Sequence, residues 1–186
     1  MTDAATTDGL LLRGPPRTVD QDRYFPFVIA TIANKISRGG SRVYLRLFGV
    51  GIIEWRIMYV LADMPGATAQ AICTRIELDK AAASRSIQVL EAMGYVTTAA
   101  DPADARKRSL ALTAEGMALH DRILQVAFQR EQHLLEGFSP SERELFLSLL
   151  RRMHANAIEM DGYEYDAPPE EAVPAGAVRR RRVVAA

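Results

Sequence analysis

The feature that most constrains this chain is a change of periodicity at Gly94. Before it, apolar residues recur at helical spacing. After it, Tyr95–Thr98 and Ser109–Thr113 are rich in β-forming or alternating residues, and they flank a polar, turn-prone segment before helical spacing returns at Ala114. Side chains return to the same face at every second residue of a strand and about every 3.6 residues of a helix. The pattern therefore predicts one β-hairpin set between helices.

Four helices are predicted before the hairpin. The first is long and contains the pair Gly39-Gly40, where a kink is expected. Thr68 and Asp79 are good N-cap residues for the third and fourth helices, and Gly94 is a good C-cap for the fourth. The helices are expected over about Val28–Phe48, Ile53–Leu61, Ala69–Arg75 and Lys80–Met93.

Two more helices are predicted after the hairpin. Residues 114–137 carry an apolar stripe formed by Met117, Leu124, Phe128 and Leu135. Ser139-Pro140-Ser141-Glu142 is a strong helix start, since serine caps, proline suits the first turn and glutamate returns the capping bond. The last helix should run to about Met160, and its apolar stripe needs a partner.

Composition indicates a soluble globular protein, with 48% hydrophobic and 25% charged residues among 186. This length suits one domain with an oligomerisation appendage. The sequence shows neither a signal peptide nor an apolar run of roughly 20 residues, so a cytoplasmic location without membrane contact is expected. One cysteine excludes an intrachain disulfide.

The two ends and the overall charge carry less information. Residues 1–22 and 162–186 are expected to be disordered, because proline, glycine and charge leave no face to bury. Lys plus Arg equal Asp plus Glu at 23 each, so a nucleic-acid partner would depend on local basic clusters. The run Arg179–Arg182 is either a solvated end or a source of nonspecific DNA attraction.

The order of the elements is that of a winged helix-turn-helix: short helices, then a hairpin with a basic tip. In the fourth helix, Ala83, Ile87, Leu90 and Met93 should face the core, which leaves the opposite side free. Arginine pairs well with guanine and glutamine with adenine in a major groove. The candidate DNA-binding residues are Thr68, Lys80, Ala81, Ser84, Arg85 and Gln88 in the helices, and Asp104, Arg106, Lys107 and Arg108 in the wing.

The segment from Gly94 through Asp101-Pro102 and Arg106 to Leu112-Thr113-Ala-Glu-Gly116 resembles the wing signature of the MarR (multiple antibiotic resistance regulator) family. The resemblance implies a mainly α fold with a small two-stranded wing, and a homodimer that reads a palindromic operator. It also implies that Arg106 is the wing arginine and that Asp104 orients it. Many members carry an arginine where this chain has Thr97, Thr98 and Ala99; Arg108 or Arg75 would compensate.

The implied organisation assigns a role to each part of the chain. It comprises a dimerisation helix (residues 23–50), a winged helix-turn-helix region (51–113) and C-terminal dimerisation helices (114–161), between the disordered arm (1–22) and tail (162–186).

Members of the family commonly bind small aromatic anions, and the sequence contains candidate residues for binding them. Arginines at four-residue spacing supply cations, and Trp55 and Tyr59 supply aromatic walls. The alternative is that the arginines merely cover the surface of a helix and that Trp55 belongs to the core. The candidate effector residues are Arg38, Arg42, Arg46, Trp55 and Tyr59, and the expected effector is an aromatic acid or its coenzyme A thioester.

Other classes of function have weaker support. The three histidines, His120, His133 and His154, lack metal-ligand spacing, and neither a phosphate loop nor a nucleophile motif is present, so no catalysis, metal or cofactor is expected. A redox-responsive regulator that uses Cys73 is one alternative, although a buried cysteine is more often an inert thiol than a redox sensor. A helical protein-interaction module is the remaining alternative.

Overall fold

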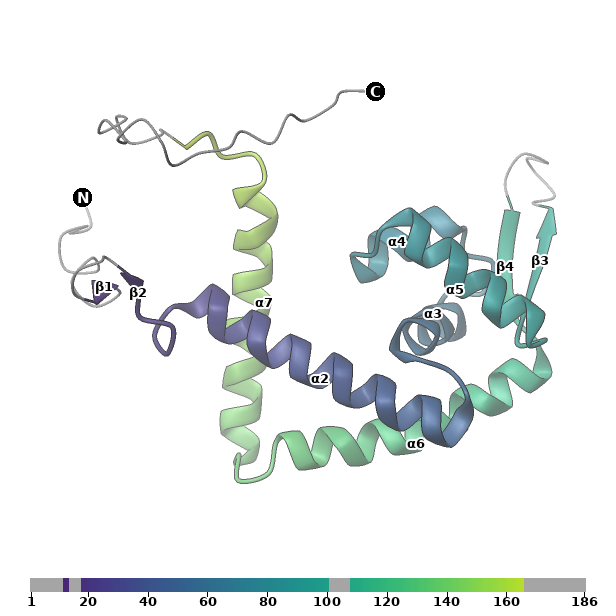
Figure 1. Cartoon of the computed structure of the whole chain (residues 1–186), viewed down its shortest axis with the longest axis horizontal. Helices are drawn as coiled ribbons and strands as arrows, with labels where there is room; N and C mark the ends of the chain where they lie inside the picture. The colour runs from purple at the N-terminus through teal and green to yellow at the C-terminus, as the bar shows by residue number, and fades with distance from the viewer. Residues whose placement is uncertain (1–11, 14–17, 101–107, 166–186) are drawn as a thin grey trace, which may run out of the picture. The chain divides into compact units, whose positions relative to one another are not determined.

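The structure is a computed structural model that describes residues 12–13, 18–100 and 108–165 (Figure 1). The chain divides into two compact units, one up to Leu134 and the other from Leu135 onward.

The described residues of the first unit form five helices and two small sheets. Helix α3 (Ile52–Asp63) lies at its centre and packs against the other four helices and against strand β4 (Figure 1). Its residues Ile57, Met58 and Leu61 are completely or almost completely buried. The other helices are α2 (Phe25–Phe48), α4 (Ala69–Ile76), α5 (Lys80–Ala92) and α6 (Ala114–Leu134).

The predicted caps form as hydrogen bonds. Thr68 Oγ1 accepts from the Ala71 N–H at 3.2 Å, and Asp79 Oδ1 accepts from the Ala82 N–H at 2.9 Å. Gly94 follows α5 with φ of 77°, a left-handed conformation that glycine adopts without steric cost. The third and fourth helices therefore begin where the sequence predicts.

The wing hairpin consists of β3 (Val96–Ala100) and β4 (Arg108–Leu112), paired antiparallel with Val96 opposite Leu112. The loop before α4 adds to it, because Leu110 accepts from the Gly66 N–H at 2.8 Å and donates to the Ala67 carbonyl at 3.0 Å. These bonds fix the hairpin against the start of α4.

The motif at the end of the wing joins three elements. The Thr113 hydroxyl donates to the Gly94 carbonyl at 2.7 Å and accepts from the Gly116 N–H at 3.0 Å, so it caps α6 and holds the end of α5. Gly116 lies directly against the Tyr95 backbone: a Cβ there would fall 2.0 Å from the Tyr95 carbonyl oxygen. Only glycine allows this approach.

Several local expectations were wrong. Leu12–Arg13 (β1) pairs with Thr18–Val19 (β2), so the wing hairpin is not the only sheet among the described residues. Strands of two residues are too short to give an alternating pattern. Met93 is 39% exposed rather than in the core, because α5 already ends at Ala92.

The apolar stripe predicted for α6 is also misplaced. Phe128 is 55% exposed and Met117 39%, whereas Leu119, His120 and Ile123 are buried. The buried side is the one that meets α3, and Trp55 of α3 stacks on the His120 ring at 5.2 Å between centroids. Packing against α3 decides which side of α6 is buried. The spacing of apolar residues within α6 does not predict that side by itself.

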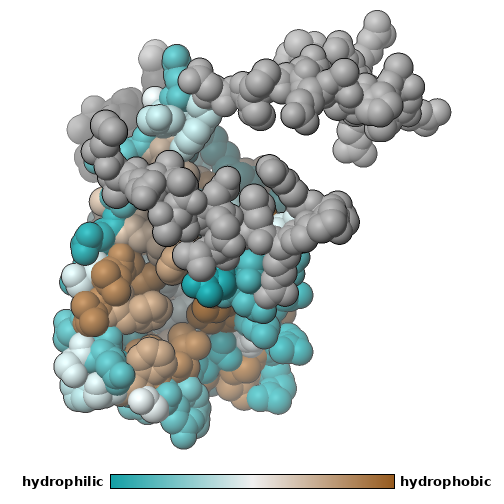
Figure 2. Space-filling view, turned by 90° about the vertical axis from the view of Figure 1, so that its left-hand side faces the viewer, coloured by the Kyte–Doolittle hydropathy of each residue, from teal (hydrophilic) through white to brown (hydrophobic). Residues whose placement is uncertain are grey.

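The second unit consists mainly of α7 (Pro140–Met160). Ser139 caps it, and Arg143 donates to the carbonyl of Leu135 at 3.0 Å. None of its residues is buried, and Leu145, Leu149 and Ile158 are 61%, 47% and 62% exposed. Apolar side chains that the single chain leaves uncovered form brown areas in Figure 2.

The start of α7 should respond to pH through Glu142. The Ser139 hydroxyl and N–H donate to Glu142 Oε2 at 2.6 and 2.8 Å, and these bonds lower the pKa of Glu142. A lowered folded-state pKa means that the stabilisation is complete above the unfolded pKa, about 4.3, and is lost as pH falls through the folded value.

We therefore expect the difference in melting temperature between the wild type and Glu142→Gln to shrink as the pH is lowered from about 6 to about 3. Thermal melts followed by circular dichroism measure it. Glu144→Gln, outside the capping box on the same helix, is the control. A difference that stays constant over this range would contradict the assignment.

Within the described residues, no helix is long and apolar enough to cross a membrane.

Candidate nucleic-acid interface

Helices α4 and α5 are joined by a tight turn. Glu77 ends α4 with φ of 51°, a left-handed conformation that few non-glycine residues adopt, and its N–H donates to the Cys73 carbonyl. Asp79 then caps α5 two residues later. This turn sets the direction in which α5 leaves α4.

Helix α5 has one buried side and one open side. Ala83, Ile87 and Leu90 are at most 7% exposed, which confirms three of the four predicted core positions. The residues of the opposite side are all exposed, as predicted. This outer face of α5 consists of Ala81, Ser84, Arg85 and Gln88, with Lys80 exposed at the start of the helix.

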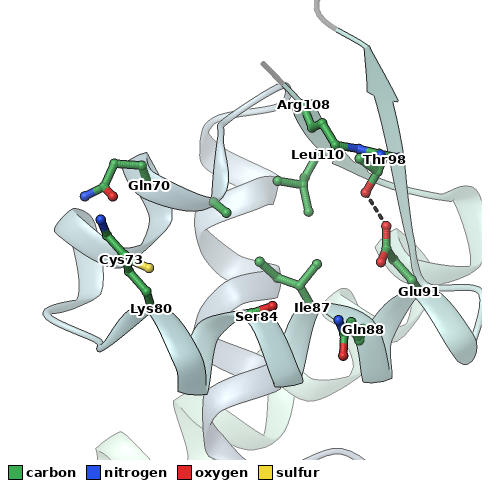
Figure 3. Close-up of a pocket in the computed structure, with 11 residues that line it drawn as sticks. Gln70, Cys73, Lys80, Ser84, Ile87, Gln88, Glu91, Thr98, Arg108 and Leu110 are labelled. Carbon is green, nitrogen blue, oxygen red and sulfur yellow. Dashed lines mark hydrogen bonds between the residues drawn. The ribbon is translucent and has the colours of Figure 1, made fainter. Parts of the chain in front are cut away.

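A groove of about 520 Å³ separates α4 and α5 from the hairpin (Figure 3). Its walls carry polar and cationic groups, and Ile87 and Leu110 form its apolar floor. The polar side chains are Gln70 of α4, Lys80, Ser84, Gln88 and Glu91 of α5, and Thr98 and Arg108 of the hairpin. Four predicted contact residues are therefore brought to one groove.

The hairpin side of this groove holds one arginine and one carboxylate. Arg108 is exposed at the start of β4, opposite Ala100 of β3, and it lines the groove together with Thr98. The Thr98 hydroxyl donates to Glu91, the dashed line in Figure 3, which ties the last turn of α5 to β3. The Arg108 guanidinium is suited to bind a phosphate oxygen.

The remaining residues that the sequence singled out are less exposed than the outer face of α5 or lie outside the described residues. Thr68 is half-buried, since its hydroxyl oxygen caps α4 and its backbone pairs with Ser109. Asp104, Arg106 and Lys107 lie outside the described residues. Cys73 is 6% exposed and reaches the edge of the groove, as expected for an inward-packing position.

The five candidate effector residues are divided between the core and the surface of the described chain. Trp55 is 7% exposed and belongs to the core, whereas Tyr59, four residues later, is 41% exposed. Arg38 and Arg42 line an open hollow along α2, and Arg46 is exposed at the end of that helix.

A cavity of about 550 Å³ between α2 and α6 combines the cationic and aromatic groups instead. Arg130 of α6 donates to the Ile36 carbonyl at 3.2 Å and lies over the Tyr44 ring at 5.8 Å from its centroid. Lys35 and His133 also line this cavity. No local sequence pattern predicts this cluster, because Arg130 and Ile36 are 94 residues apart.

Among the described residues, no group of three or more histidine, cysteine, aspartate or glutamate side chains is placed to hold a metal ion.

Comparison with known proteins adds to this geometry. A profile described as the MarR family matches residues 48–107. The transcriptional regulator HosA of Escherichia coli O111:H- is 31% identical over 100 residues, which cover 54% of this chain and 74% of HosA.

Solved structures are similar over most of the chain. A MarR/EmrR family transcriptional regulator from Acinetobacter sp. ADP1 is 32% identical with a TM-score of 0.71, over 76% of this chain and 99% of that one. MepR of S. aureus, solved as a DNA complex, shares the fold at 18% identity with a TM-score of 0.65, over 74% of this chain and 99% of MepR.

Proposed function

Because this chain belongs to the MarR family and is a DNA-binding transcriptional regulator rather than an enzyme, we propose that it acts as a ligand-responsive repressor. It binds a palindromic operator as a homodimer. A small aromatic acid or its coenzyme A thioester releases it.

The outer face of α5 is the observation that carries the proposal. It presents Ser84, Arg85 and Gln88 to solvent, while small Ala81 lets the start of the helix approach a major groove closely. Arg108 stands on the other wall of the adjoining groove, where its guanidinium is available to a phosphate of the DNA backbone. Base reading thus belongs to α5 and phosphate binding to the hairpin.

Uncovered apolar side chains support the dimer. In the first unit, Phe25 and Ile32 of α2 are 73% and 46% exposed, and in the second unit Leu145 and Ile158 of α7 are 61% and 62% exposed. Large apolar side chains that are exposed on neighbouring turns of a helix are typical of association surfaces. A two-fold dimer places two α5 helices on one operator, whose half-sites are then related by inversion.

The cavity between α2 and α6 supports ligand control. Arg130 and Lys35 supply positive charge and Tyr44 an aromatic wall, which suits a carboxylate attached to a ring. A ligand that prefers a dimer with mis-spaced α5 helices shifts the population away from the DNA-binding state. Hundred-fold weaker operator binding requires a preference of about 2.7 kcal/mol.

Selection from a pool of random duplexes tests the repressor's DNA target. The enriched sequence should be an inverted repeat with half-site centres about one helical turn apart. Affinity for it should exceed that for a scrambled duplex at every salt concentration and fall linearly with the logarithm of salt. Equal, weak binding to both duplexes would instead favour a protein-interaction module.

Effector release is tested with benzoate, 4-hydroxybenzoate and benzoyl-coenzyme A. Trp55 is the single tryptophan, so its fluorescence should change on binding while labelled operator is released. Arg130→Gln should keep operator affinity but lose the response. Arg122→Gln is the matched control, because Arg122 lies on the same helix over the Phe48 ring, outside the cavity. If neither acid nor thioester changes either signal, this effector class is wrong.

A further inference from the structure

Ser86 is a polar residue on the buried side of α5. It is 5% exposed and shares that side with Ala83, Ile87 and Leu90. A hydroxyl in such surroundings requires a hydrogen-bond partner. Its partner comes from another helix: Ser86 Oγ donates to Oε1 of Glu54 in α3 at 2.7 Å.

The second oxygen of Glu54 is also occupied. Oε2 accepts from the Gly51 N–H at 2.9 Å, at the junction between α2 and α3. A Cβ on Gly51 would lie 2.7 Å from Oε2, so glycine makes room for the carboxylate. One side chain therefore fixes both the start of α3 and the middle of α5.

This bond differs in kind from the contacts around it. Apolar packing is non-directional and leaves a short helix some freedom to roll or slide. A hydrogen bond requires a narrow range of distance and angle, and a carboxylate acceptor makes it stronger. Successive helix residues are about 100° apart, so fixing Ser86 inward also fixes the direction of Arg85 and Gln88.

We propose that Glu54 and Ser86 are positioning residues for DNA recognition, which set the roll of α5 so that Arg85 meets its base in register. The inference rests on the proposed role of the outer face of α5. Neither residue touches DNA. Their effect is confined to sequence-selective binding, since phosphate contacts tolerate small rotations better than paired bonds to a base edge.

The test uses the full-length Ser86→Ala protein with the selected duplex and its scrambled counterpart. Affinity for the selected duplex should fall about tenfold, because a misdirected Arg85 loses much of its paired contact with the base. Affinity for the scrambled duplex and the salt slope should not change. Alanine fills the buried position and favours helix, and thermal melts verify that the fold persists.

Ser37→Ala is the matched control. The Ser37 hydroxyl accepts from Arg56 at 3.2 Å, so this variant also removes a hydrogen bond between two helices, α2 and α3, without involving α5. Its affinity for the selected duplex should stay within about twofold of the wild type. Equal losses in Ser37→Ala and Ser86→Ala would overturn the inference, because loosening of helix packing would then explain both.

The double variant Arg85→Ala/Ser86→Ala separates positioning from general structure. If Ser86 acts through Arg85, the double variant binds no more weakly than Arg85→Ala; additive losses would contradict the inference. Unchanged affinity of Arg85→Ala would instead reject the proposed DNA-binding face. Weak binding by Arg85→Ala combined with wild-type affinity of Ser86→Ala would reject only the positioning role.

Discussion

Gly116→Ala is expected to destabilise the first unit by about 3 kcal/mol, at the upper end of what overpacking costs. The added Cβ would lie 2.0 Å from the carbonyl oxygen of Tyr95 and 2.9 Å from its carbonyl carbon. Backbone atoms cannot rotate away as the end of a side chain can. The same oxygen accepts from the Thr113 N–H at 3.0 Å, so separating the two segments also breaks that bond.

Urea denaturation followed by circular dichroism measures this loss. Gly39→Ala is the control, since a Cβ there meets only the guanidinium of Arg130, at 3.4 Å and on a flexible side chain. Alanine within a helix is favoured over glycine by up to about 1 kcal/mol, so this control should be neutral or stabilising. A Gly116→Ala protein as stable as the control would show that α6 can shift without cost.

Arg85→Ala is expected to weaken binding to the selected operator by about 1–3 kcal/mol, which corresponds to roughly fivefold to 150-fold, with little change for a scrambled duplex. Arg85 is exposed near the centre of the outer face of α5, between Ser84 and buried Ser86. A guanidinium in a major groove pairs with both acceptors of a guanine, and the alanine variant loses discrimination at that base pair.

Fluorescence anisotropy with duplexes substituted one base pair at a time locates that position. Arg108→Ala is the informative comparison, because a phosphate contact should weaken binding to every duplex alike and lower the salt slope by about one. If Arg85→Ala shows this uniform pattern, Arg85 binds the backbone rather than a base.

Short-range features of the fold are correctly predicted from the sequence. Thr68, Asp79 and Ser139 begin α4, α5 and α7, and Gly94 follows the end of α5. Each depends on a hydrogen bond or a backbone conformation within a few residues, so the local sequence contains all the information. The exposed outer face of α5 follows in the same way from helical spacing.

Features that depend on a neighbouring element are predicted less well. Helix α6 carries apolar residues on more than one side, and contact with α3 buries Leu119 and Ile123 while Phe128 stays 55% exposed. Trp55 and Tyr59 share a four-residue spacing, yet only Trp55 is buried. The spacing of residues in the sequence predicts which of them share a side of a helix. It does not predict which side of the helix the neighbouring elements cover.

The order of the helices, three of their N-caps, the wing hairpin and the family can be read from the sequence, because these follow from local bonding and from a motif of fixed spacing. Which groups meet across the chain depends on the tertiary structure. Examples are Glu54 with Ser86, 32 residues apart, and Arg130 with Ile36, 94 residues apart. Such contacts depend on the docking of whole helices, which no short segment encodes.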